Sequence, residues 1–342
     1  MQVQSMPSDS HHLPVAQDVP ERPLVAVAGP TGSGKSELAL CLAAEFNGEI
    51  VNCDSLQVYR HFDIGTAKLL PAGRRGIPHH LIDIVNPDQL FTAGEFARLG
   101  REAIGDISAR GRLPIVAGGT GFYLRALIDG LFQGPTRDQP LRDRLAARES
   151  RRPGSLHRLL RRFDPATAAK IHANDAPKVM RALEVCLVAR RPASELFRTG
   201  RDALRGYRIL KLGLLPDRDA LYSRLDRRCA QMFESGLVDE VRHILELGFP
   251  RTSKPFEAMG YRQALQFLEG ELSPRDAIFY AQRTTRQYAK RQITWFRREQ
   301  GLIWLRGFGG EPGIQTEAVG KVREFLAVSN GFKPPMNADE RC

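Results

Sequence analysis

The sequence predicts an α/β fold, in which a parallel sheet is flanked by helices and interrupted by an all-helical insertion. Three apolar segments, residues 24–28, 49–52 and 113–117, each end in a polar loop, and helical patterns separate them. Strands that alternate with helices form parallel sheets, and ligands bind beyond the carboxyl ends of such strands. We therefore expect the three loops to meet in one crevice.

The other elements follow in chain order. The first loop is followed by an expected helix at 37–45, and apolar residues at helical spacing predict another at 92–110. After residue 205 the pattern predicts strands at 207–214 and 302–305, and helices at 218–236, 237–247, 256–269 and 274–298. We expect a disordered tail (1–22), a discontinuous core (23–130 and 206–310), a helical insertion (131–205) and a C-terminal tail (311–342).

The chain has 342 residues and a net charge of +11, and most of that charge lies in the insertion. Between Leu131 and Arg205 there are 17 Lys and Arg against 8 Asp and Glu. This concentration predicts a polyanionic partner such as nucleic acid, although Arg-rich helices are also found as solvated surfaces. No segment approaches the roughly 18 apolar residues that cross a bilayer. The five scattered cysteines indicate neither disulfides nor a zinc site. The first 20 residues have neither the apolar core of a secretory signal nor the arginines of a transit peptide, so we expect a cytoplasmic protein without a membrane partner.

A glycine-rich loop stands between the first strand and the first helix. It consists of Gly29, Pro30, Thr31, Gly32, Ser33, Gly34, Lys35 and Ser36. This pattern in this context is typical of a phosphate-binding loop (P-loop), because its backbone N–H groups and the helix N-terminus converge on one anion. Lys35 can reach a terminal phosphate, and the Ser36 hydroxyl can join a Mg²⁺ shell. The loop predicts a polyphosphate ligand without specifying which one.

Four further features are candidates for chemistry, each with a simpler alternative. Asp54, at the end of the second strand, is either a general base beside the phosphates or a helix cap or Mg²⁺ partner. Thr120 lies in a glycine-rich loop that could merely cap a helix. Arg262 could clamp a diphosphate or be a surface charge. The segment 283–298 has six basic residues and no acid, which indicates either a phosphate-binding stripe or a core helix with a charged outer face.

Taken together, the motifs of this chain resemble those of the bacterial tRNA dimethylallyltransferases, also called the IPP transferase family. The resemblance covers about residues 23 to 306 and rests on the segments 29–36, 54–60, 63–68, 79–83, 118–123, 181–185, 260–263 and 285–296. It implies a Mg²⁺-dependent enzyme on a P-loop core, acting as a monomer. The implied reaction moves a dimethylallyl group from its diphosphate to N6 of the adenosine at position 37 of tRNA, next to the anticodon.

The resemblance also implies roles for single residues. Lys35 and Arg262 would stabilise the leaving diphosphate, Ser36 would bind Mg²⁺, and Asp54 would accept the proton from N6. Contacts to tRNA are implied for Asp54, Ser55, Leu56, Gln57, Thr120, Arg142, Pro177, Lys178, Val179, Met180, Arg181 and Arg286.

Two positions depart from the family pattern. Pro177-Lys178 stands where a Gln-Arg pair is usual, and Cys53 where a small residue such as Ala is usual. Pro177 removes a backbone donor, and Lys178 replaces a planar fork of donors by a point charge.

Two rival functions use fewer of these features. A small-molecule or nucleoside kinase would bind ATP through the same loop, and it would leave the basic insertion without a partner. An RNA-binding protein that only senses a nucleotide would need Lys35 but not Asp54.

Overall fold

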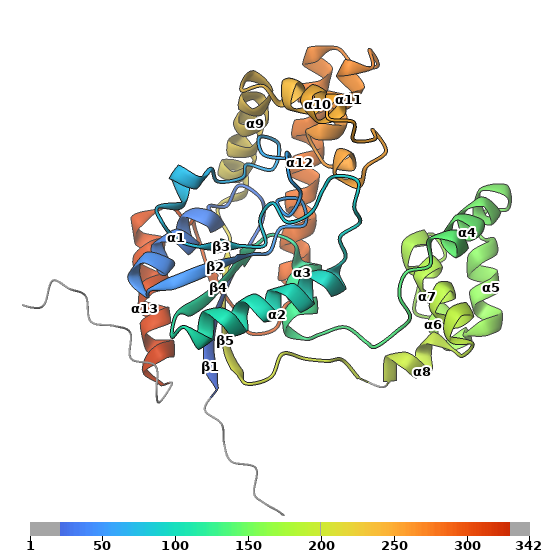
Figure 1. Ribbon diagram of the computed structural model, residues 1–342, viewed down its shortest axis with the longest axis horizontal. Helices are drawn as coiled ribbons and strands as arrows, with labels where there is room; N and C mark the ends of the chain where they lie inside the picture. The colour runs from blue at the N-terminus through green and yellow to red at the C-terminus, as the bar shows by residue number, and fades with distance from the viewer. Residues whose placement is uncertain (1–20, 199, 329–342) are drawn as a thin grey trace, which may run out of the picture.

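The computed structural model describes residues 21–198 and 200–328 and contains a parallel sheet. Its order is β3-β2-β4-β1-β5-β6, and every pair of neighbouring strands is parallel (Figure 1). The strands are β1 (Arg22–Ala28), β2 (Gly48–Asn52), β3 (His79–His80), β4 (Leu113–Gly118), β5 (Tyr207–Leu214) and β6 (Leu302–Leu305). The α/β prediction is confirmed; only the two-residue strand β3 was not expected.

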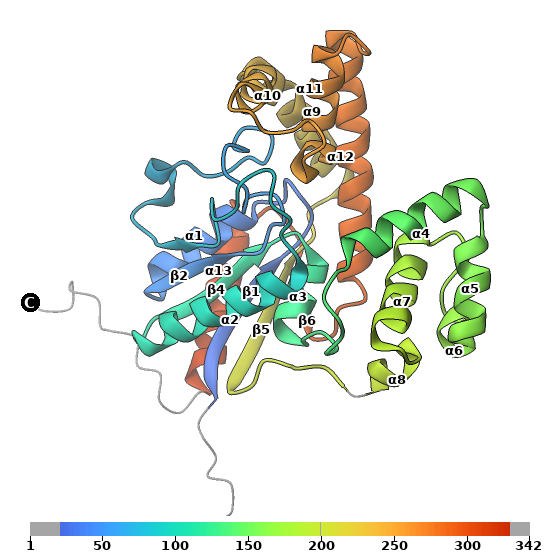
Figure 2. The ribbon, with the colours of Figure 1, turned by 45° about the vertical axis from the view of Figure 1, so that its right-hand side comes forward.

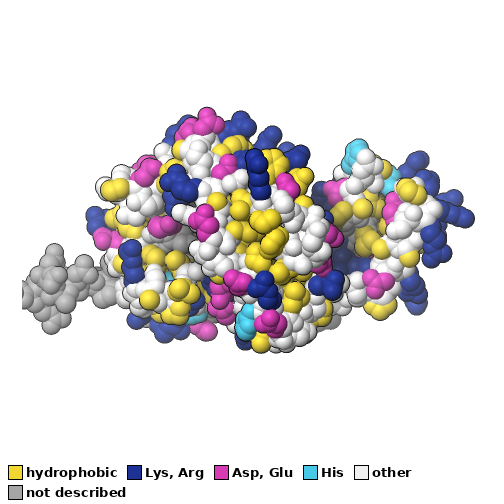
Figure 3. Space-filling view, turned by 90° about the horizontal axis from the view of Figure 1, so that it is seen from above, with side chains coloured by type: hydrophobic (Ala, Val, Ile, Leu, Met, Phe, Trp, Pro, Cys, Tyr) yellow, Lys and Arg dark blue, Asp and Glu magenta, His cyan; other side chains and the backbone are white. Residues whose placement is uncertain are grey.

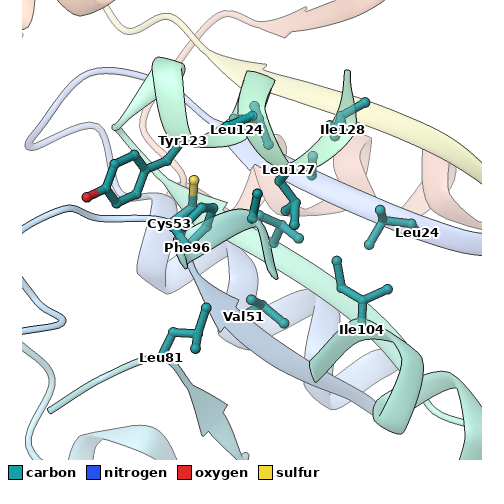
Figure 4. Packing of buried hydrophobic residues seen from close by; sticks show 14 of the residues in the cluster. Leu24, Val51, Cys53, Leu81, Phe96, Ile104, Tyr123, Leu124, Leu127 and Ile128 are labelled. Carbon is teal, nitrogen blue, oxygen red and sulfur yellow. The ribbon is translucent and has the colours of Figure 1, made fainter. Parts of the chain in front are cut away.

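Helices cover both faces of the sheet, which explains why β1 is apolar and buried from Pro23 to Ala28. Alternate residues of β1 contribute to different apolar clusters. Leu24 packs with α2 (Ala93–Ala109) and α3 (Gly121–Ile128), as Figure 4 shows. Val25, its neighbour, packs with α1 (Lys35–Glu45) and α13 (Pro312–Ala327) on the other face.

Helix α13 corrects the prediction of a C-terminal tail at 311–342. Its buried residues Ile314, Ala318, Val322 and Leu326 recur every four positions and pack against α1 and the sheet. This spacing forms an apolar stripe on a helix, and it could have been recognised in the sequence. The rest of that segment, from residue 329, and residues 1–20 of the expected N-terminal tail lie outside the described residues.

A group of helices stands above the carboxyl ends of the strands (Figure 2). It consists of α9 (Arg218–Glu234), α10 (Leu237–Glu246), α11 (Tyr261–Leu268) and α12 (Pro274–Phe296). The helix expected at 256–269 is divided into a short 3₁₀ turn, η2 (Lys254–Glu257), and α11. Gly260 between them has φ 85°, a left-handed conformation that an α-helix does not allow. Another 3₁₀ turn, η1 (Pro71–Arg74), lies between β2 and β3.

The insertion forms a helical bundle beside the sheet (Figures 1 and 2). Its helices are α4 (Gln139–Arg151), α5 (Ser155–Phe163), α6 (Pro165–Ala168), α7 (Ala176–Ala189) and α8 (Ala193–Arg198). They surround a separate apolar cluster that includes Leu156, Leu160 and Leu183. In the part of the chain that the structure describes, no helix is both long and apolar enough to cross a membrane.

Candidate active site

The loops that follow β1, β2 and β4 meet at the carboxyl edge of the sheet, as predicted. Thr31 of the phosphate loop and Asp54 of the loop after β2 line the same cavity. The hydroxyl of Thr120, after β4, accepts a hydrogen bond from the N–H of Ser55 at 3.1 Å. The three strands are neighbours in the sheet, so their loops share one edge.

The phosphate loop leaves the N-terminus of α1 free of side-chain caps. Gly34 precedes the helix with φ 88°, and no side chain accepts from the first N–H groups of α1. Gly34 also contacts another loop closely, because a Cβ at this position would lie 2.7 Å from the nitrogen of Gly309. Uncapped N–H groups and the helix dipole make this end of α1 suited to binding an anion.

Two cations lie at the loop without a carboxylate partner. Lys35 Nζ donates to the carbonyl of Pro30 at 2.7 Å, and Arg228 Nη2 from α9 donates to the Thr31 hydroxyl at 2.6 Å. The Arg228 Nε is buried without a hydrogen-bond partner, and neither cation forms an ion pair among the described residues. Burial lowers the pKa of Lys35 to about 8 and also lowers the pKa of Arg228. The loop therefore has positive charge that an anion would stabilise.

Arg228, rather than the predicted Arg262, contacts the phosphate loop. Arg262 follows Tyr261, whose side chain is buried, so the turn of α11 directs Arg262 toward solvent. Arg262 is absent from the residues that line the cavity, whereas Arg228 is among them. The sequence gives no local signal for this choice, because Arg228 belongs to a helix with several other arginines.

Asp54 lies in the cavity and also stabilises its own loop. One carboxylate oxygen, Oδ1, accepts from the N–H of Leu56 at 2.9 Å and from that of Gln57 at 3.4 Å. Oδ1 therefore caps the loop, as the capping alternative predicts. No described residue donates a hydrogen bond to Oδ2. This arrangement fixes the carboxylate and leaves one of its oxygens able to accept a proton.

The rest of the cavity is largely apolar. Tyr288 of α12 lines it, and burial raises the pKa of this phenol to about 12. The other lining residues include Leu56, Met232, Phe233, Leu237, Met259 and Ala281. The cavity thus combines cations at one wall with a surface that suits a small hydrocarbon group.

Ser36 and Gln57 lie beside this cavity rather than in it. Ser36 is exposed on the first turn of α1 and lines a smaller cavity with Asn52 and Gln57. The described residues contain no cluster of three or more His, Cys, Asp or Glu side chains that could hold a metal ion. Mg²⁺ needs few protein ligands when phosphates and water complete its shell, so a single exposed hydroxyl fits this ion.

Thr120 is the N-cap residue of α3, but its hydroxyl does not cap the helix. Its side chain makes no capping bond and instead contacts Ser55. Gln57 donates from Nε2 to the carbonyl of Thr66 at 3.1 Å. The Thr120–Ser55 contact joins the loops after β2 and β4, and the Gln57–Thr66 contact lies within the loop after β2.

In the insertion, the predicted tRNA-contacting arginines hold a buried carboxylate. Arg142 bonds to Glu184 through Nε and Nη2, both at 2.8 Å, and Arg181 bonds to it at 2.6 Å. Glu184 is 0% exposed. Burial alone would raise the pKa of Glu184, but the hydrogen bonds from Arg142, Arg181 and the N–H of Asp138 lower it to about 2. These arginines stabilise the bundle in addition to any RNA contact.

The residues of α7 that are predicted to contact RNA differ in their exposure to solvent. Pro177 lies in the first turn, where the missing N–H costs no intrahelical bond, and Lys178 is exposed. Met180 is partly buried. Val179 is 1% exposed, and its side chain lies within the bundle core. Figure 3 shows Lys and Arg side chains gathered on the surface of the bundle.

On α12, the basic segment serves the core as well as the surface. Arg286 pairs with Asp226 of α9, whereas Arg283 and Lys290 are exposed. Ala289, Gln292 and Phe296 are buried. The alternative of a core helix with a charged outer face is therefore correct. The exposed side chains of that outer face can still contact RNA phosphates.

The fold and the site define an α/β protein whose glycine-rich loop, a cation and a carboxylate share one cavity at the edge of the sheet. The family model described as IPP transferase matches residues 57–299, and the chain belongs to this family. The family resemblance drawn from the sequence motifs is confirmed.

Three relatives illustrate the match. A tRNA dimethylallyltransferase of Solibacter usitatus is 74% identical over 304 residues, which cover 89% of this chain and 99% of that protein. The structure of the tRNA isopentenylpyrophosphate transferase of Bacillus halodurans is 37% identical, with a TM-score of 0.66, and covers 90% of this chain and 96% of that one. The structure of a eukaryotic dimethylallyltransferase, described as acting on tRNA, is 30% identical with a TM-score of 0.78. The match covers 90% of this chain and 80% of that one.

Proposed function

We propose that this protein transfers the dimethylallyl group of dimethylallyl diphosphate to N6 of the adenosine at position 37 of tRNA. The observation that carries the proposal is that Asp54 shares one cavity with Thr31 of the phosphate loop and with Arg228. An amine that displaces diphosphate needs an anion pocket and a proton acceptor on opposite sides of the reacting carbon. The names of the similar proteins support the same reaction.

The reaction breaks the bond between C1 of the dimethylallyl group and a diphosphate oxygen, and it forms a bond between C1 and N6. The N–H groups at the start of α1, together with Lys35 and Arg228, stabilise the charge that develops on the leaving diphosphate. The N6 lone pair is delocalised into the adenine ring, so N6 is a weak nucleophile. Asp54 accepts a proton from N6 as the new bond forms. The products are N6-dimethylallyladenosine and diphosphate.

The apolar wall of the cavity binds the dimethylallyl group in this proposal. Phe233 and Leu237 exclude water from the carbon that reacts, which protects it from hydrolysis. Ser36 would hold Mg²⁺, which supplies further positive charge to the diphosphate when bound.

The target base lies within a folded anticodon arm, so it must be flipped out to reach Asp54. We assign Ser55, Leu56, Gln57 and Thr120, which surround Asp54, to contacts with the target nucleotide. The exposed cations of the insertion, such as Lys178, are assigned to phosphates of the anticodon arm. We propose a cytoplasmic enzyme that acts as a monomer.

The test is to incubate the purified protein with Mg²⁺, dimethylallyl diphosphate and unmodified tRNA, and then to analyse the nucleosides by mass spectrometry. A dimethylallyl-modified adenosine is expected from the wild type and not from Asp54→Asn. The absence of product, when a relative named as a tRNA dimethylallyltransferase is active on the same tRNA, would contradict the proposal. Consumption of ATP in a parallel reaction would favour the kinase alternative.

A further inference from the structure

The side chain of Gln292 connects the loop after β1 to the loop after β4. This residue of α12 is 6% exposed. Its Oε1 accepts from the N–H of Thr31 at 2.8 Å, and its Nε2 donates to the carbonyl of Gly119 at 2.8 Å. An N–H group can only donate and a carbonyl can only accept, so these partners allow a single orientation of the amide.

One end of this connection leads to the anion site. Gln292 holds the backbone of Thr31, and the hydroxyl of Thr31 accepts from Arg228 Nη2 at 2.6 Å. The guanidinium of Arg228 is therefore oriented by a residue that is itself fixed from α12. The Nε of Arg228 has no hydrogen-bond partner, so among the described residues the Thr31 hydroxyl is the group that orients the guanidinium.

The other end leads to the proton acceptor. Gly119 precedes Thr120, whose hydroxyl accepts from the N–H of Ser55, the residue after Asp54. The approach is so close that a Cβ on Gly119 would lie 2.4 Å from Nε2 of Gln292. The amide thus joins two short chains of contacts, of which one ends at Arg228 and the other at Asp54.

We infer that Gln292 is a positioning residue, which sets the distance between the cations that hold the diphosphate and the carboxylate that accepts the proton. The inference rests on the proposed function. In this role Gln292 acts through the two loops and contacts neither the diphosphate nor the target base. A transfer reaction depends on the alignment of leaving group, nucleophile and base, and a misplacement of about 1 Å can cost on the order of 100-fold in rate.

The test compares Gln292→Met with Gln282→Met. Methionine has a similar volume and cannot make either hydrogen bond. Gln282 lies on the same helix, donates to the carbonyl of Asp226 in α9 at 3.0 Å, and does not line the cavity. We expect Gln292→Met to lower kcat on the order of 30-fold and to raise KM for dimethylallyl diphosphate, with KM for tRNA unchanged. Gln282→Met should stay within about twofold of the wild type. Equal losses in both variants, or an unchanged kcat in Gln292→Met, would overturn the inference.

The variant Gln292→Glu gives a second readout. A protonated carboxyl has one acceptor and one donor oxygen and can replace the amide, whereas a carboxylate repels the carbonyl of Gly119. We expect the activity of Gln292→Glu, divided by that of the wild type at each pH, to increase as pH falls. A ratio that does not depend on pH would contradict the inference.

Binding of inorganic diphosphate, measured by calorimetry, separates this inference from the proposed function. If the wild type binds diphosphate but transfers no dimethylallyl group, the proposed function fails. The affinity of Gln292→Met still tests the anion half of the connection, because it should be several-fold weaker than that of the wild type. An equal affinity would show that Gln292 does not orient the anion site.

Discussion

The cleft above the sheet and the helical insertion both hold partly buried cations, but these differ in their partners: among the described residues Lys35 and Arg228 of the cleft form no ion pair, whereas Arg142 and Arg181 of the insertion do. In the cleft, Lys35 and Arg228 donate to oxygen atoms of the phosphate loop. In the insertion, Arg142 and Arg181 share the buried carboxylate of Glu184. A desolvated cation without a counter-charge costs free energy that an anionic ligand recovers, whereas a paired cation stabilises the scaffold. The comparison therefore distinguishes cations that lack an ion-pair partner from cations that hold the insertion together.

The largest effect should come from Asp54→Asn. Asparagine keeps the oxygen that accepts from the N–H of Leu56, so the loop is retained while the proton acceptor is lost. We expect kcat to fall by about 1000-fold, with tRNA affinity within about twofold. The matched variant is Asp138→Asn in the insertion, where the carboxylate accepts from the N–H of Leu141 at 2.9 Å and no catalytic role is proposed. Single-turnover kinetics and tRNA binding should be measured for both; a normal rate in Asp54→Asn would exclude Asp54 as the base.

The second effect concerns the stability of the insertion in acid. The folded pKa of Glu184, about 2, lies below its ordinary value of 4.5. Its contribution is therefore complete above pH 4.5 and is lost as pH falls toward 2, which amounts to about 3 kcal/mol. Urea denaturation followed by circular dichroism at pH 5 and pH 3 should show a larger loss for the wild type than for Glu184→Gln. The same loss in both proteins would show that Glu184 is not responsible.

The third effect separates the two kinds of arginine directly. We expect Arg228→Met to weaken the binding of inorganic diphosphate on the order of 10- to 100-fold, because it removes a charge-assisted donor from the anion site. Arg142→Met should leave this affinity unchanged. It should lower the melting temperature, because the buried carboxylate of Glu184 loses a charged hydrogen-bond donor. Calorimetry and thermal denaturation of both variants would reveal the reverse pattern if the assignment of the two regions is wrong.

The smallest effect is the pH dependence of diphosphate binding in the cleft. Lys35 has a pKa of about 8 in the free protein, and a bound diphosphate would raise it. Binding above pH 8 should therefore take up a proton, and affinity should decrease by up to about tenfold per pH unit. Calorimetry at pH 8.5 in two buffers with different ionisation enthalpies measures this uptake. Lys35→Arg, which stays charged, should show only the proton exchange of the ligand itself; no difference between the two proteins would contradict the assignment.

The sequence predicted most of the core because its signals are local. The strand expected at 24–28 is the buried strand β1, and the phosphate loop follows it in the expected position. Apolar runs for strands, helical spacing and turn residues act over a few positions, so they can be read without knowledge of the fold. The pattern of α13 was also local, but it was missed within a segment rich in Gly and Pro.

The residues that tertiary structure decided are those whose role depends on distant partners. Arg228 is 197 positions from Thr31, and Gln292 is 261 positions from it. No sequence spacing indicates which arginine of α9 or α11 faces the cavity, because the docking of each helix on the core decides this.

By itself, the sequence determined the class of fold, the phosphate loop, the basic insertion and the family. Each depends on composition or on contiguous residues, such as the loop 29–36. Only the tertiary structure decided that Arg228 rather than Arg262 lies at the loop, and that Arg142 and Arg181 hold Glu184. The physical reason is that burial and counter-charge arise from packing between elements that the chain brings together only when it folds.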